Sequence, residues 1–272
     1  MTAHASTLQH VAPGEGINPA KMPGHWVLAR AGKQVLRPGG RDLTRKMLAG
    51  LAITGRDDVV EFAPGMGATT RLAIAAQPRS YTAIERDEHA MAHVSTLLTG
   101  PGYACHRGTA QSTGLADECA TVVFGEAFLT MQSDEHKRQI AAEAFRILRS
   151  GGRYGLHELA LTPDTLDEEI QADIRGELSR SIHVGARPLT HAGWREILTE
   201  AGFEIVTEAR APMALLEPRR LLADEGISRL AKIALNILRD RTARARVDEM
   251  RAMFRNRAGN MDAIMVVARK PA

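Results

Sequence analysis

Short apolar runs alternate with amphipathic stretches through most of this chain of 272 residues. The runs that we expect to form strands are 58–62, 80–84, 103–106, 120–125, 153–161, 203–209 and 261–268. The helices expected with them include 69–76, 87–98, 133–148, 165–179 and 190–201. This alternation indicates an α/β fold, a mostly parallel seven-stranded sheet with helices on both faces. Ligands of such sheets bind at the carboxyl ends of the strands, so the residues after each strand are the candidate site residues.

The pattern also divides the chain into parts. Residues 1–20 are small, polar and interrupted by prolines and glycines, which is typical of a flexible arm. Two helices are expected next, the first from Trp26 to Leu36. About fifty residues separate the last two strands, too many for a simple turn, so a helical insertion is expected there. After the arm, we expect an N-terminal helical cap at 21–55 and a ligand-binding α/β core at 56–209. The insertion at 210–260 would serve as a lid or an oligomer interface, and 261–272 would add the last strand of the core.

Composition narrows the class of protein. Two cysteines, Cys105 and Cys119, are too few for a disulfide framework or a cysteine-ligated zinc site. No run approaches the roughly 20 apolar residues of a membrane span, and the first residues lack the basic and apolar segments of a secretory signal. The formal net charge of +3 does not by itself call for nucleic acid. We therefore expect a cytoplasmic protein without a membrane span.

The most informative segment is the predicted strand–turn–helix at 61–70, Glu-Phe-Ala-Pro-Gly-Met-Gly-Ala-Thr-Thr. Gly65 and Gly67 allow backbone conformations closed to other residues and let a ligand approach the main chain. The third glycine of the dinucleotide fingerprint is missing, and a carboxylate at Glu61 would repel a phosphate but attract an ammonium group. Glu85 ends the next strand, which suits hydrogen bonds to the two hydroxyls of a ribose. A ligand with a ribose, a cationic amino end and no phosphates is indicated, and S-adenosylmethionine fits that description.

Here the sequence resembles the class I S-adenosylmethionine-dependent methyltransferases, in the small-molecule branch typified by ubiquinone/menaquinone-biosynthesis and arsenite-type enzymes. The resemblance covers about residues 39–203. Besides the glycine loop, it rests on Gly-Thr-Ala-Gln at 108–111, Leu-Arg-Ser-Gly-Gly-Arg at 148–153 and Leu-Thr-Glu-Ala-Gly-Phe at 198–203. Thr109 stands where the family often has aspartate, and Ser150 replaces a proline. The turn at 38–40 and Thr44 also resemble a segment that helps to close the cofactor pocket.

The resemblance implies a Rossmann-like fold, S-adenosylmethionine as cofactor with S-adenosylhomocysteine as product, and a set of cofactor-binding residues. That set is Glu61, Ala63, Gly65, Gly67, Glu85, Arg86, Thr109, Ala110, Gln111 and Glu126. The family has no universal catalytic residue, and we assign none. His157 and Glu158 end a strand and are expected to point toward the substrate mouth, where either is a candidate general base, with packing as the other interpretation. We see no cluster of acids placed to hold a metal.

The acceptor is expected to be a small organic molecule. Nucleic-acid amino-methyltransferases carry Asp/Asn-Pro-Pro-Tyr/Phe after the fourth strand, where this chain has Gly-Glu-Ala-Phe at 125–128, and arsenite enzymes need more cysteines. Two other hypotheses stay open, an NAD(P)-dependent oxidoreductase and a non-catalytic binding or assembly protein with the same fold. The arginine-rich stretch 239–257 could bind an acidic ligand, RNA or a membrane surface, but a solvated amphipathic helix is favoured. A homodimer through 210–260 is a further hypothesis.

Overall fold

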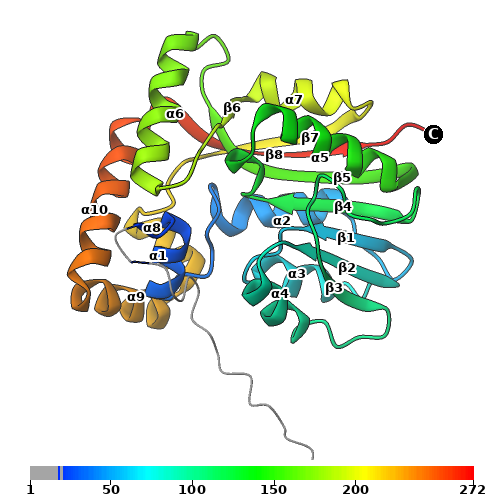
Figure 1. The fold of residues 1–272 in the computed structure, drawn as a ribbon, viewed down its shortest axis with the longest axis horizontal. Helices are drawn as coiled ribbons and strands as arrows, with labels where there is room; N and C mark the ends of the chain where they lie inside the picture. Colours follow the sequence, from blue (N-terminus) through cyan, green and yellow to red (C-terminus); the bar gives the residue numbers. More distant parts are fainter. Residues whose placement is uncertain (1–17, 19–20) are drawn as a thin grey trace, which may run out of the picture.

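The computed structural model describes residue 18 and residues 21–272 (Figure 1). The strands are β1 (Asp58–Phe62), β2 (Ser80–Glu85), β3 (Tyr103–Arg107), β4 (Ala120–Glu126), β5 (Leu148–Leu161), β6 (Leu189–Thr190), β7 (Glu204–Pro212) and β8 (Met261–Arg269). The helices are α1 (Gly24–Ala31), α2 (Gly40–Leu51), α3 (Ala68–Ile74), α4 (Glu88–Ser95), η2 (Leu129–Met131), α5 (Asp134–Ile147), α6 (Glu168–Ile182), α7 (His191–Glu200), α8 (Pro218–Glu225), α9 (Ile227–Arg239) and α10 (Arg241–Asn256). The arm expected at 1–20 lies outside the described residues except for Asn18.

One sheet joins all the strands of the described part of the chain. Its order is β3-β2-β1-β4-β5-β8-β7, and β6 pairs with β5 outside that path. Strands β1 to β5 pair in parallel, and β8 runs antiparallel to both β5 and β7. The predicted α/β class and the mostly parallel, Rossmann-like sheet are therefore confirmed, with the two-residue β6 added to the seven expected strands.

Helices cover the sheet on both faces, as expected (Figure 1). Successive side chains of a strand point to opposite faces, and β1 follows this rule. Val59 belongs to an apolar cluster with α2, α3 and α4, whereas Val60 and Phe62 belong to a cluster with α5 and α7. Because both faces are buried, the carboxyl-terminal edge of the parallel strands is the place left for a ligand.

A lobe of helices adjoins this edge of the sheet (Figure 1). Helices α1, α6 and α10 share a second apolar core, to which Leu28, Leu178 and Met250 contribute. Helices α8, α9 and α10 fill the connection between β7 and β8, which confirms the helical insertion before the last strand. Helix α2 packs instead on the sheet, against β5, β7 and β8. None of the helices in residues 21–272 is long and apolar enough to span a membrane.

The first helix ends earlier than the sequence predicted. It was expected to reach Leu36, but it stops at Ala31 because Gly32 adopts a left-handed conformation, with φ of +104°. The N–H of Gly32 then closes the helix on a carbonyl of its last turn, that of Ala29, at 2.9 Å. Residues 32–39 therefore lie outside the helix and connect the lobe to α2.

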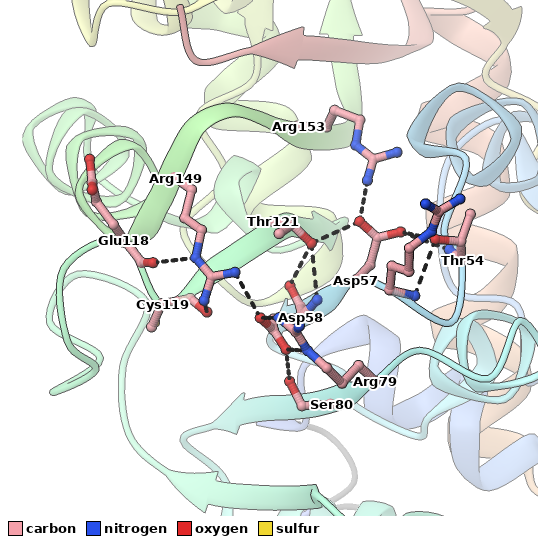
Figure 2. Close-up of polar contacts among 11 residues, drawn as sticks. Thr54, Asp57, Asp58, Arg79, Ser80, Glu118, Cys119, Thr121, Arg149 and Arg153 are labelled. Carbon is pink, nitrogen blue, oxygen red and sulfur yellow. Dashed lines mark hydrogen bonds and ion pairs between the residues drawn. The ribbon is translucent and has the colours of Figure 1, made fainter. Parts of the chain in front are cut away.

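Figure 2 shows a polar network at the amino-terminal ends of β1 and β4, away from the ligand edge. Asp57 accepts hydrogen bonds from the hydroxyls of Thr54 and Thr121, at 2.8 Å each, and pairs with Arg153 of β5. Asp58 pairs with Arg149 of β5 and accepts hydrogen bonds from the side chains of Arg79 and Ser80, at the start of β2. Burial alone would raise the pKa of Asp57, but the bonds from Thr121 and Thr54 hold the pKa below its ordinary value. The network therefore fixes β1 to its neighbours through ionised carboxylates.

Replacing Asp57 with asparagine is expected to lower the free energy of unfolding by about 2 kcal/mol, because charge-assisted hydrogen bonds are lost and Arg153 keeps only main-chain carbonyls as partners. Urea unfolding followed by circular dichroism measures the change. Asp248→Asn is the matched control, since Asp248 is exposed and lies 3.9 Å from Arg244. Identical unfolding midpoints for Asp57→Asn and the wild type would contradict the role given to the network.

Candidate cofactor site

The loop between β1 and α3 is open at one glycine and tightly packed at the other. Gly65 has φ of +56°, and nothing lies within 4 Å of the point where a side chain would begin. Gly67 has φ of +67°, and a side chain there would collide with Leu97. Backbone conformation favours glycine at both positions, and at Gly67 a side chain would also have to displace the end of Leu97. Ala63 donates its N–H to the carbonyl of Ile84 (2.9 Å), which ties the loop to the end of β2.

Glu85 joins the glycine loop to the start of α4. Its Oε2 accepts the N–H of Gly65 at 3.0 Å, and its Oε1 accepts those of Arg86 and Asp87 at 2.8 and 2.9 Å. Glu85 is buried, while the side chain of Arg86 is exposed. The carboxylate is thus fixed by main-chain donors beside the open face of Gly65.

The segment after β3 is attached to the main chain at the end of β2. Gly108 donates its N–H to the carbonyl of Glu85 at 3.0 Å. The exposed Thr109 and the buried Ala110 follow, and Gln111 donates from Nε2 to a side-chain oxygen in the turn before α5 at 3.3 Å. The structure therefore brings this predicted group of residues, the glycine loop and Glu85 to one edge of the sheet.

Glu61 lies beneath the glycine loop, where it is buried. It accepts hydrogen bonds from the hydroxyls of Thr70 (2.5 Å) and Tyr81 (2.6 Å). Burial raises the pKa of Glu61 to about 7, because these two hydrogen bonds only partly offset the loss of water and the charge of Glu126 adds to the rise. A carboxyl group with a pKa near neutrality can change its charge when a cation binds close to it.

Glu126, at the end of β4, is the centre of a buried charged cluster. Its carboxylate accepts hydrogen bonds from Thr44 Oγ1 (2.6 Å) and from the hydroxyl of Thr69, and it meets His157 Nδ1 at 2.6 Å. The Nε of Arg37 lies 3.3 Å from it. Burial alone would raise the pKa of Glu126, but Arg37, His157 and Thr44 outweigh burial and hold the pKa at about 2. The carboxylate is therefore ionised at neutral pH, and its charge holds the cluster together.

The two candidates for a general base lie on opposite faces of β5, which corrects the expectation that both point toward the substrate mouth. His157 is buried, with Nδ1 on Glu126 and Nε2 at 2.5 Å from the carbonyl oxygen of Pro38. Glu158 is also buried, and it accepts three main-chain N–H groups and one hydroxyl from residues 128–130. Burial raises the pKa of Glu158 in spite of these bonds. Glu158 thus holds the turn before α5, and only His157 faces the charged cluster.

Residues 33–41, here called the cap segment, cover the charged cluster and are held by the insertion. Near its start, the main-chain N–H groups of Gln34 and Val35 donate to Glu225 at 2.9 Å each. At its end, the N–H of Arg41 donates to Asp224 at 3.0 Å. Between these attachments, Arg37 and Pro38 contact the cluster. Two acids at the end of α8 therefore hold the cover of the site in place.

Solved structures share this fold. Phosphoethanolamine N-methyltransferase 2 of Haemonchus contortus, solved with phosphomonomethylethanolamine and S-adenosylhomocysteine, has a TM-score of 0.67 at 15% identity over 92% of this chain and 58% of that chain. The cyclopropane synthase MmaA2 of Mycobacterium tuberculosis has a TM-score of 0.65 at 17% identity over 85% of this chain and 84% of that chain. At these identities the likeness concerns the fold.

The sequence comparisons concern the family. A family model described as a methyltransferase domain matches residues 60–156, which include the glycine loop, Glu85 and Glu126. An uncharacterized protein of Haemophilus influenzae is 33% identical over 221 residues, which are 79% of this chain and 86% of that protein. The chain carries a methyltransferase domain on the fold of the S-adenosylmethionine-dependent methyltransferases. Its resemblance to the quinone-biosynthesis and arsenite-type branch stays a prediction.

Several residues of the site were not singled out from the sequence of this methyltransferase. Arg37, directly after the first predicted helix, was given no role, and Tyr81 was interpreted only as part of a strand. Asp224 and Glu225 were not distinguished from other charges of the insertion. Glu225 and its partner Val35 are 190 residues apart, so no local pattern could join them. Among the described residues, no group of three histidine, cysteine or carboxylate side chains is placed to hold a metal ion.

Proposed function

We propose that this methyltransferase transfers the methyl group of S-adenosylmethionine to a small organic acceptor by in-line displacement. The observation that carries the proposal is the Glu85 carboxylate, which three main-chain N–H groups fix against the open face of Gly65. A carboxylate in that place suits the two hydroxyls of a ribose, which donate to it. The positive φ and empty surroundings of Gly65 leave the main chain accessible to the ligand.

The other residues of the edge fit the rest of the cofactor. Ala63, Gly65 and Gly67 supply main-chain surface, and Arg86 with 109–111 borders the adenine side. Glu61 and Glu126 place negative charge toward the amino-acid end, where the ammonium and sulfonium groups carry positive charge. Arg37, next to Glu126, is the cation that we assign to the carboxylate of the cofactor.

When bound, the cofactor supplies a methyl group that its sulfonium charge already activates. The chain must chiefly hold the accepting atom about 3–3.5 Å from the methyl carbon, in line with the carbon–sulfur bond that breaks. His157 does not accept a proton in the arrangement described, because its two ring nitrogens face Glu126 and the carbonyl of Pro38. An acceptor that already offers a lone pair, such as an amine or a thiolate, therefore fits this site best, because it needs no general base.

Isothermal titration calorimetry separates this proposal from its alternatives. We expect S-adenosylhomocysteine to bind with a micromolar or tighter Kd, and NADH and NADPH to give no binding heat. Binding of NADPH without S-adenosylhomocysteine would favour an oxidoreductase. Binding of neither, together with a stable oligomer, would favour an assembly protein. Pools of small amines, thiols and phenols, incubated with S-adenosylmethionine and assayed for S-adenosylhomocysteine, then identify the acceptor.

A further inference from the structure

The outward face of α9 exposes large apolar side chains. Ile227 is 79% exposed, Leu238 is 63% exposed and Leu235 is 46% exposed. With Ala231 they recur at intervals of four, four and three residues, so they form one stripe along the helix. Seven large apolar side chains are exposed in the described part of the chain, and three of them lie on this one helix. Such a concentration marks an interaction surface.

The opposite side of α9 is already attached to the lobe. Ile233 is buried, and Asn236 Nδ2 donates to the carbonyl of Ala31 in α1 at 3.0 Å. Arg229 lies 3.5 Å from Glu225, the residue that holds the cap segment. Figure 1 shows α9 next to α1 and α8, with α10 turning back along the outside of the lobe. The helix is thus anchored through one side, and the apolar stripe faces away from the protein.

Cations border the stripe. Lys232 and Arg239 of α9 are exposed, and neither has an acidic side chain within 4 Å among residues 21–272. Helix α9 itself contains no aspartate or glutamate. Lys232 and Arg239 are seven residues apart, so they lie above one another along the edge of the stripe. The surface therefore combines apolar contact area with positive charge that the described chain does not neutralise.

We propose that α9 docks this protein on a lipid bilayer that contains anionic lipids. An apolar stripe bordered by lysine and arginine is typical of helices that lie in the membrane interface, with the apolar side chains among the acyl chains and the cations at the headgroups. A second copy of the chain is a poorer occupant. A twofold contact through this face would set Lys232 and Arg239 against the same residues of the copy, whereas anionic headgroups neutralise them.

Sedimentation with lipid vesicles tests the proposal on the full chain, without cofactor, so its result is independent of methyl transfer. We expect wild-type protein to sediment with vesicles of phosphatidylcholine and phosphatidylglycerol, to do so less at high salt, and not to sediment with phosphatidylcholine alone. The double variant Leu235→Glu/Leu238→Glu is expected to lower the partition coefficient at least about tenfold. Lys232→Glu/Arg239→Glu is expected to act in the same direction.

Val206→Glu is the matched control, because Val206 is 60% exposed on β7, outside the insertion. It is expected to bind vesicles like the wild type, and circular dichroism checks that all variants are folded. Equal binding of the wild type and the Leu235/Leu238 variant would overturn the proposal. So would failure of the wild type to bind the anionic vesicles. A dimer in analytical ultracentrifugation that the same double variant dissociates, without vesicle binding, would assign the stripe to a second copy of the chain.

Discussion

The Glu85→Ala variant is expected to bind S-adenosylhomocysteine at least about a hundredfold more weakly than the wild type. Two charge-assisted hydrogen bonds to the ribose would be lost, each worth about 1.5–3 kcal/mol, and every 1.4 kcal/mol is about tenfold in Kd. The loop would also lose an anchor, since Glu85 accepts the N–H of Gly65 at 3.0 Å. Calorimetric titration of the folded variant measures the change in Kd.

Two further variants separate lost ribose contacts from a loosened loop. Glu85→Gln keeps one oxygen that can accept the N–H of Gly65 but removes the charge, so we expect a smaller loss than with alanine. Glu88→Ala is the matched control, because the Glu88 side chain is 71% exposed and lies only three positions further along the chain. A folded Glu85→Ala protein with wild-type affinity would contradict the assignment of the cofactor site.

The parts of the fold that could be predicted are those with local signals. The turn after β1 carries two glycines, and the structure gives both a positive φ. The helix predicted at 190–201 begins with a threonine, a residue type that commonly caps helices, and the hydroxyl of Thr190 accepts the N–H of Gly193 at 3.1 Å. Because parallel strands end on one edge, the ends of β1 and β2 could also be placed together, and Glu85 contacts Gly65 there.

The ends of helices were harder to place. The helix expected at 133–148 was to include Leu148. It stops at Ile147 instead, and Leu148 already starts β5 as a buried member of the sheet core. Helix pattern and strand pattern both accept a leucine at this position, so only the tertiary burial of Leu148 decides between them.

The family resemblance indicated that the turn at 38–40 and Thr44 cover the site, but the charged contacts of this cover could not be predicted, because they are distant in sequence. The carbonyl of Pro38 meets His157 across 119 positions, and the N–H of Arg41 meets Asp224 across 183. The residues that surround Glu126 come from the cap segment, α2, α3 and β5. Hydrophobic periodicity places the elements that carry them but says nothing of which charges meet once the elements have packed.

Replacement by glutamine is expected to act in opposite directions at two buried carboxyl groups of the site, Glu126 and Glu61. The pKa of Glu126 is lowered from 4.5 to about 2, so its stabilising contribution is present above pH 4.5 and is lost as the pH falls toward 2. At about 1.4 kcal/mol for each pKa unit, Glu126→Gln should lower the free energy of unfolding at pH 8 by about 3 kcal/mol. Arg37 would also be left buried without its carboxylate.

Glu61→Gln is expected instead to raise the free energy of unfolding at pH 8. The pKa of Glu61 is raised from 4.5 to about 7, so ionising this group costs stability as the pH rises through that interval. At pH 8 the variant should be more stable than the wild type by about 2–3 kcal/mol, with little difference at pH 5. Urea unfolding at both pH values measures this, and a Glu61→Gln protein that is less stable than the wild type at pH 8 would contradict the raised pKa. A carboxyl group that destabilises the unliganded protein is retained if it binds the cationic end of the cofactor, so the stabilised Glu61→Gln variant should also bind S-adenosylmethionine more weakly.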